Sequence, residues 1–119
     1  MKWFQNQVDK WMVTCFGPHV SKDRYIRCCR FFEEAAELVQ AGGMSREDAH
    51  KLVDYTYDRP VGEVGQEVGG VMVTLAAFCN AFEIELGKAS TTELIRCWDN
   101  IEKIRAKQAN KPHNSPLAQ

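Results

Sequence analysis

Apolar residues recur every three to four positions along most of the chain, which is the spacing of amphipathic helices. The pattern is interrupted where glycine, proline and capping residues gather, and these interruptions divide it into about five helices. The helices are expected over residues 4–15, 22–41, 46–57, 63–82 and 91–109. No stretch alternates between apolar and polar residues in the manner of a strand, so the predicted fold class is all-α.

Capping residues predict where several of these helices begin and end. Ser21, Ser45 and Ser90 stand at expected N-caps, where a serine oxygen accepts a hydrogen bond from a free backbone N–H. A carboxylate follows Ser45 and Ser90 three residues later, which completes a capping box in each case. Gly42 is expected to end the second helix and Gly87 the fourth.

The length of 119 residues, of which 45% are hydrophobic, suits one domain with a core of its own. We expect this domain to span residues 1–109. The segment 110–119 carries two prolines and few apolar residues, and it is predicted to be flexible or held against a partner.

Charge and cysteine usage indicate a cytoplasmic protein that binds neither nucleic acid nor membranes. The net charge is −1, and the basic residues are dispersed except at the end of the chain. The longest apolar run, residues 68–79, is shorter than the roughly 20 residues that cross a bilayer, and the N-terminus lacks the apolar stretch of a secretion signal. The five cysteines show no C-x-x-C spacing and are interpreted as buried free thiols.

The helix expected at 63–82 is apolar on nearly every side, which is typical of a helix surrounded by protein. Its polar side chains, Glu63, Glu67 and Thr74, share one narrow arc with Gly70, so Glu67 is expected to be partly buried. Because a few short helices cannot easily surround it, we expect a second copy of the chain to complete the bundle.

A second acidic group lies on the helix expected at 22–41, where Glu33, Glu34 and Glu37 fall within one arc. A buried carboxylate at position 67 would need a compensating positive charge, from either a metal ion or a basic side chain. The basic candidates are Arg30, Lys103 and Arg105. If the two acidic arcs face each other, a cation must lie between them, and oxygen ligands without His or Cys suit Mg²⁺ or Mn²⁺.

The run Glu33-Glu34-Ala35-Ala36-Glu37, followed by Glu67-Val68-Gly69-Gly70, resembles the E-E-x-x-E … E-x-x-D signature of the MazG-like nucleotide pyrophosphohydrolases. The resemblance covers roughly residues 20–107. It implies an all-α helical bundle built as a homodimer or a dimer of dimers, with Mg²⁺ bound by the acidic residues. It also implies hydrolysis of a nucleoside triphosphate to pyrophosphate and a nucleoside monophosphate.

The resemblance assigns roles to particular residues. Glu34 and Glu37 would be catalytic. The implied metal ligands are Glu33, Glu34, Glu37 and Glu67, with Glu63 as a further candidate. The residues implied to bind substrate are Arg30, Lys103, Arg105 and Lys107. Among the aromatic residues of the first helix, Trp11 is a candidate for stacking on a base, the alternative being that these side chains pack in the core.

Gly70 departs from the signature because it stands where an aspartate is expected. The alternative hypothesis is therefore a catalytically impaired nucleotide-binding or assembly module on the same scaffold. A di-iron carboxylate bundle is disfavoured, since the chain has no Glu-x-x-His pair.

Overall fold

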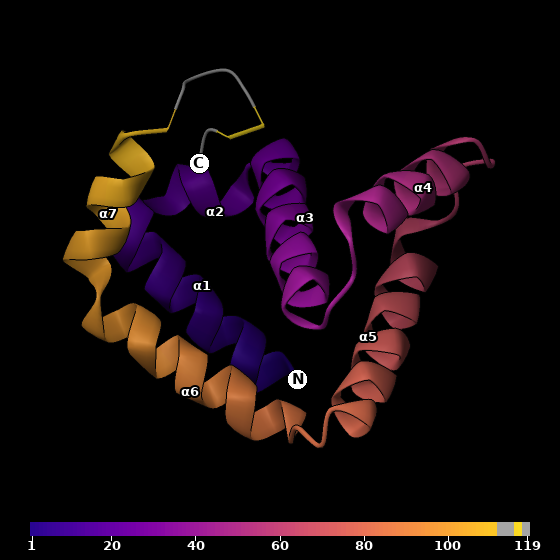
Figure 1. Cartoon of the computed structure of the whole chain (residues 1–119). Helices are drawn as coiled ribbons and strands as arrows, with labels where there is room; N and C mark the ends of the chain where they lie inside the picture. The colour runs from indigo at the N-terminus through magenta and orange to yellow at the C-terminus, as the bar shows by residue number, and fades with distance from the viewer. Residues whose placement is uncertain (112–115, 118–119) are drawn as a thin grey trace. The chain divides into compact units, whose positions relative to one another are not determined.

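A computed structural model describes residues 1–111 and 116–117, and all the regular structure within them is helical, as predicted. The described residues form seven helices where about five were expected, and Figure 1 shows their order along the chain. They are α1 (Lys2–Phe16), α2 (Pro18–Lys22), α3 (Arg24–Ala41), α4 (Arg46–Tyr57), α5 (Val64–Ala81), α6 (Leu86–Asp99) and α7 (Ile101–Ala109). The number differs because the short helix α2 precedes the predicted second helix and the predicted last helix is divided into α6 and α7. The predicted tail, 110–119, lies partly outside the described residues.

The chain divides into two compact units. The first consists of Met1–Val39 with Glu93–Gln119, and the second of Gln40–Thr92. Both boundaries fall inside helices, near the end of α3 and in the middle of α6.

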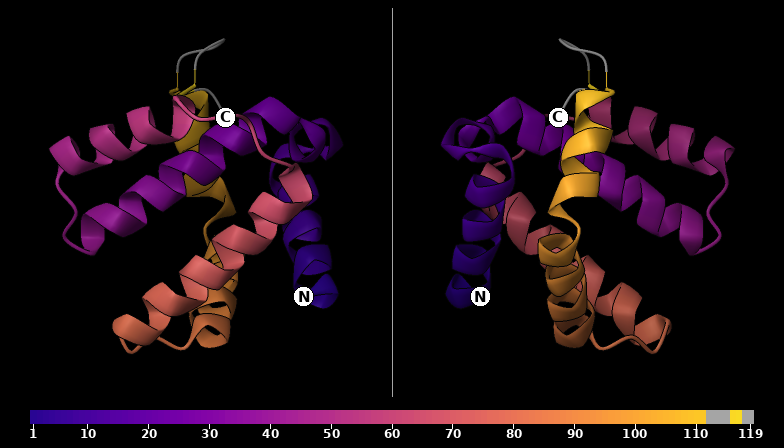
Figure 2. Two further views of the ribbon diagram at one scale, coloured as in Figure 1. Left: turned by 90° about the vertical axis from the view of Figure 1, so that its right-hand side faces the viewer. Right: turned by 90° about the vertical axis from the view of Figure 1, so that its left-hand side faces the viewer.

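Helix α1 is the centre of the first unit. It packs against α2 and α7, and its inner face carries Met12 and Cys15, which are only 7% and 4% exposed. Arg105 of α7 donates from Nε to the carbonyl of Cys15 and from Nη2 to that of Thr14, both at 2.7 Å. These bonds satisfy carbonyls that the end of a helix leaves free, and they hold α7 against the C-terminal end of α1 (Figure 2).

The connection from α1 to α3 corrects the predicted start of the second helix. Gly17 has a φ of 91°, a backbone conformation that glycine adopts readily, and the short helix α2 follows it. Ser21 lies inside α2, where its hydroxyl donates to the carbonyl of Pro18. Asp23 is the residue that caps α3, because its Oδ1 accepts from the backbone N–H of Ile26 at 3.0 Å.

In the second unit, the predicted start of α4 is confirmed. The Ser45 hydroxyl accepts from the backbone N–H of Asp48 at 3.1 Å. Helix α5 is capped by Glu63, whose two carboxylate oxygens accept from the backbone N–H groups of Gly65 and Gln66 at 3.0 and 2.7 Å.

The C-terminal end of α5 packs against the turn after α3. Phe78 and Phe82 stack with ring centroids 4.3 Å apart, and the neighbouring Cys79 is buried. A Cβ atom at Gly42 would lie 3.2 Å from the Phe78 ring, so this close approach favours a residue without a side chain.

The predictions at Gly87 and Ser90 were wrong. Helix α6 already begins at Leu86, where the Glu85 carboxylate accepts from the backbone N–H groups of Gly87 and Lys88. Ser90 is inside the helix, and its hydroxyl donates to the carbonyl of Leu86 at 2.7 Å. The helix then breaks at Asn100, and α7 follows.

Burial is lower than the sequence pattern predicts. Cys79 is the one buried residue of α5, whereas Val64, Val68 and Val73 are 79%, 58% and 70% exposed. Glu67 is also exposed, so its expected partial burial is not found in the single chain.

Two further sequence predictions concern cysteines and membranes. All five cysteines are free thiols as predicted, but Cys28 is exposed and only Cys15 and Cys79 are buried. Among the described residues, no single helix combines the length and the apolar composition that crossing a bilayer requires.

Candidate functional site

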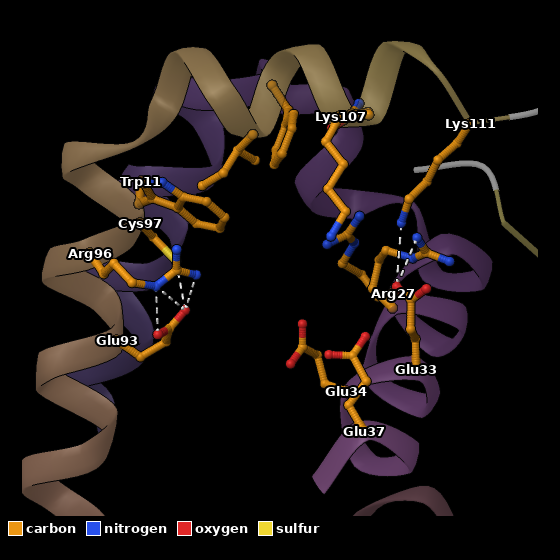
Figure 3. Close-up of a pocket in the computed structure, with 14 residues that line it drawn as sticks. Trp11, Arg27, Glu33, Glu34, Glu37, Glu93, Arg96, Cys97, Lys107 and Lys111 are labelled. Atoms are coloured by element: carbon orange, nitrogen blue, oxygen red, sulfur yellow. Dashed lines mark hydrogen bonds and ion pairs between the residues drawn. The ribbon is translucent and has the colours of Figure 1, made fainter. Parts of the chain in front are cut away.

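A cavity of about 720 Å³ lies within the first unit and is lined by both acidic and basic side chains (Figure 3). Its acidic residues are Glu33, Glu34, Glu37 and Glu93. Its basic residues are Arg27, Arg30, Arg96, Lys107 and Lys111. Trp11 and Phe16 form an aromatic part of the wall.

Helix α3 supplies three of the acids, as its helical periodicity predicts. Glu33, Glu34 and Glu37 all line the cavity, because positions one and four residues apart fall within one arc of a helix. The pKa of Glu34 is raised, first by burial and then by the negative charges of Glu37, Glu33 and Glu93. Lys107 acts in the opposite direction on the same carboxyl.

Two cations already neutralise Glu33. Its Oε1 lies 3.2 Å from Nη1 of Arg30 and 3.3 Å from Nζ of Lys111. Arg30 also donates from Nη2 to the carbonyl of Pro116 at 2.5 Å. Glu33 is therefore less available to a metal ion than its two neighbours.

Glu34 and Glu37 are placed differently from Glu33. Figure 3 shows both carboxylates extending from α3 toward the cavity, and neither forms an ion pair with a described residue. The two neighbouring carboxylates repel each other, so this position favours a cation. Carboxylate oxygens are the ligands that Mg²⁺ and Mn²⁺ prefer.

Helix α6 supplies a pair that the sequence analysis missed. Glu93 accepts from Nε of Arg96 at 2.9 and 3.1 Å and from Nη2 at 2.5 Å. The pair lowers the pKa of Glu93 and raises that of Arg96. The sequence pattern places Glu93 in a capping box with Ser90. The signal that could have identified the pair is the spacing of three residues between the negative charge of Glu93 and the positive charge of Arg96.

The predicted basic residues separate into two groups. Arg30 and Lys107 line the cavity, and the ammonium of Lys107 forms no ion pair within the part of the chain that the structure describes. Arg105 is engaged with the end of α1, and Lys103 is exposed outside the cavity.

Trp11 and Cys97 both lie on the cavity wall (Figure 3). The Trp11 indole belongs to α1 and the Cys97 thiol to α6. Its ring meets that of Phe16 edge-on, with centroids 5.7 Å apart and planes at 81°. Burial, followed by the charge of Glu93, raises the pKa of Cys97 to about 11. The thiol is therefore protonated at neutral pH and is not a nucleophile there.

Glu63 and Glu67 belong to the second unit. Glu63 caps α5, and its pKa is lowered by hydrogen bonds from the backbone N–H groups of Gln66 and Gly65. That Glu67 shares an enclosed space with the acids of α3 stays a prediction. Within the described residues, no three His, Cys, Asp or Glu side chains are grouped closely enough to hold a metal ion.

Comparison with protein-family models, with curated proteins and with solved structures gave no match. Carboxylates that can hold a cation and cations that can hold an anion share one space, an arrangement suited to a metal-bound phosphate compound.

Proposed function

We propose that the protein is a Mg²⁺-dependent nucleoside-triphosphate pyrophosphohydrolase that releases pyrophosphate and a nucleoside monophosphate. The observation that carries the proposal is that Glu34 and Glu37, which form no ion pair with a described residue, line the same cavity as Lys107 and two arginines of α3. The resemblance of the acidic run on α3 to the MazG-like signature supports the same reaction.

The acids of α3 would hold the ion. Glu34 and Glu37 fit a hard divalent cation because they offer carboxylate oxygens alone, and Glu33 and Glu67 are the further ligands that the resemblance implies. When bound, Mg²⁺ polarises the phosphate oxygens and lowers the pKa of a bound water. The carboxylate of Glu34 or Glu37 that does not bind the ion would accept the proton that the attacking water loses.

The remaining walls would hold the nucleotide. Lys107 and Arg30 face the cavity and can compensate the charge of the phosphates, while the Trp11 ring offers a surface on which a base can stack. The substrate is therefore a free nucleotide, in keeping with a net charge of −1 that does not favour binding to long nucleic acids.

The test is release of pyrophosphate from a panel of common and modified nucleoside triphosphates with Mg²⁺ or Mn²⁺. We expect activity on at least one nucleotide and a loss of 100-fold or more, on the order of a missing catalytic acid or base, in Glu34→Gln and Glu37→Gln. Glu47→Gln is the matched control, because Glu47 is exposed on α4, where it pairs with Lys51. No pyrophosphate from any nucleotide, or full activity in the double variant, would contradict the proposal.

A second candidate, a nucleotide-binding or assembly module with impaired catalysis, is favoured by Gly70. A Cβ atom at Gly70 or at Gly69 meets nothing within 4 Å, so either position accepts an aspartate without a clash. If the missing aspartate limits the reaction, Gly70→Asp raises the rate of pyrophosphate release and Gly69→Asp does not. A wild type that binds Mg²⁺ and nucleotide without turnover supports this candidate.

A further inference from the structure

We propose that Arg96 of α6 contacts the phosphate chain of the ligand from the wall of the cavity opposite Glu34 and Glu37, and that Glu93 positions it. The identification of the ligand as a nucleotide rests on the proposed function. The role of Arg96 rests on the geometry of the cavity, which this residue lines. Arg96 belongs neither to the acidic signature on α3 nor to the basic end of α7.

The hydrogen bonds of Arg96 leave part of its guanidinium free. Glu93 engages Nε and Nη2, whereas Nη1 has no hydrogen-bond partner among the described residues. Figure 3 shows the pair reaching from α6 to the edge of the cavity, across from Glu34 and Glu37. Both N–H groups of Nη1 are therefore available to an acceptor that enters the cavity.

The pair is better suited to positioning than to stabilising the fold. The side chains of Arg96 and Glu93 are 59% and 58% exposed, and exposed pairs three residues apart on a helix contribute little to stability. A guanidinium that is already held by a carboxylate has fewer rotamers to lose when a ligand binds. Glu93 thus fixes the direction from which Arg96 can donate.

The surroundings indicate what kind of ligand Arg96 would meet. Glu34 is close enough to Arg96 to raise its pKa, and Glu93 raises that of Glu34, so the two walls interact electrostatically. At the wall formed by Glu34 and Glu37, an anion is repelled unless it brings a cation with it. A planar guanidinium binds phosphate oxygens through two parallel N–H bonds. The ligand that satisfies both walls is a polyphosphate carrying a divalent cation, with the cation toward α3 and phosphate oxygens toward α6.

The proposal predicts that recognition depends on the phosphates more than on the base, so inorganic tripolyphosphate with Mg²⁺ is the probe. Calorimetry should show that it binds the full-length protein, and that Arg96→Gln weakens binding about tenfold or more, as expected for the loss of a charge-assisted hydrogen bond. Arg96→Lys keeps the charge without the planar group and should lose less affinity. Arg46→Gln, which removes the same charge from the start of α4 in the second unit, should bind like the wild type.

Two further readings separate direct contact from a structural effect. In the nucleotide assay, Arg96→Gln should raise KM more than it lowers kcat, and free guanidinium ion should partly restore binding by Arg96→Ala. Equal tripolyphosphate affinity in the wild type and Arg96→Gln, or equal weakening by Arg46→Gln, overturns the proposal.

Failure of this inference can be distinguished from failure of the proposed function. A wild type that hydrolyses nucleotides while Arg96→Gln keeps its KM overturns the role of Arg96 alone. A wild type that binds Mg²⁺-tripolyphosphate through Arg96 but hydrolyses no nucleotide supports the role of Arg96 and overturns the enzymatic proposal.

Discussion

Glu34 combines partial burial with three nearby negative charges, and both raise its pKa above the ordinary value near 4.5. A raised carboxyl pKa means that the folded chain holds this proton more tightly than the unfolded chain does. Well below pH 4.5, Glu34 is protonated in both states and does not lower the free energy of unfolding. As the pH rises through 4.5 and through the raised pKa of the folded state, the folded protein becomes less stable.

We therefore predict that Glu34→Gln stabilises the metal-free protein at pH 7 and has little effect at pH 4. Thermal unfolding of both proteins at the two pH values in EDTA measures the difference. Glu47→Gln, on the exposed face of α4, should show no such pH-dependent gain. A variant that is no more stable than the wild type at pH 7 would show that the repulsion around Glu34 is already compensated.

At this same scale, some of the candidate site was predictable and some was not. Glu33, Glu34 and Glu37 could be grouped from sequence because their geometry follows from one helix alone. Glu93 and Arg96 could be recognised as a local pair, but their place in the cavity depends on how α6 and α3 are arranged in the first unit. No periodicity within a single helix carries that information.

The apolar pattern predicted most of the helices, whereas α2, the break between α6 and α7 and several helix starts did not follow from it. Both misplaced starts have one cause: an acidic side chain, Asp23 or Glu85, caps the helix a few residues away from the serine that was expected to do so. Carboxylates and hydroxyls satisfy the same free N–H groups, so the sequence offered competing caps of similar strength.

The two predicted capping boxes can be compared by experiment. Ser45→Ala removes the acceptor for the backbone N–H of Asp48 and should lower the free energy of unfolding by about 1 kcal/mol. Ser90→Ala lies inside α6 and should change it by less than about 0.5 kcal/mol, because alanine favours a helix interior and the lost bond was made to the helix's own backbone. Urea unfolding of the two variants is the measurement. Equal losses would indicate that Ser90 caps the helix after all.

Over the whole molecule, apolar residues that the sequence pattern assigns to a core remain exposed. Among the described residues, only Met12, Cys15 and Cys79 are buried apolar side chains. The all-round apolar pattern of α5 predicts a helix covered by protein, whereas Cys79 is the one buried residue of α5 in the single chain. A sequence pattern does not say which chain would cover such a helix. We infer that a second copy does so, in keeping with the association that the MazG-like resemblance implies.

Val68 provides the sharpest test of this association, because it is 58% exposed in the first half of α5. If a second copy covers it, Val68→Lys would have to bury an unpaired ammonium, at a cost of several kcal/mol, and lose the roughly 1.5 kcal/mol that a buried valine contributes. Sedimentation should then find the wild type as a dimer or larger assembly at micromolar concentration and Val68→Lys shifted toward the monomer. Gln66→Lys adds the same charge to α5 at a position that is already polar and exposed, and it should leave the assembly intact. A monomeric wild type would contradict the inference and would mean that the apolar faces of α5 are covered from within one chain or remain open to water.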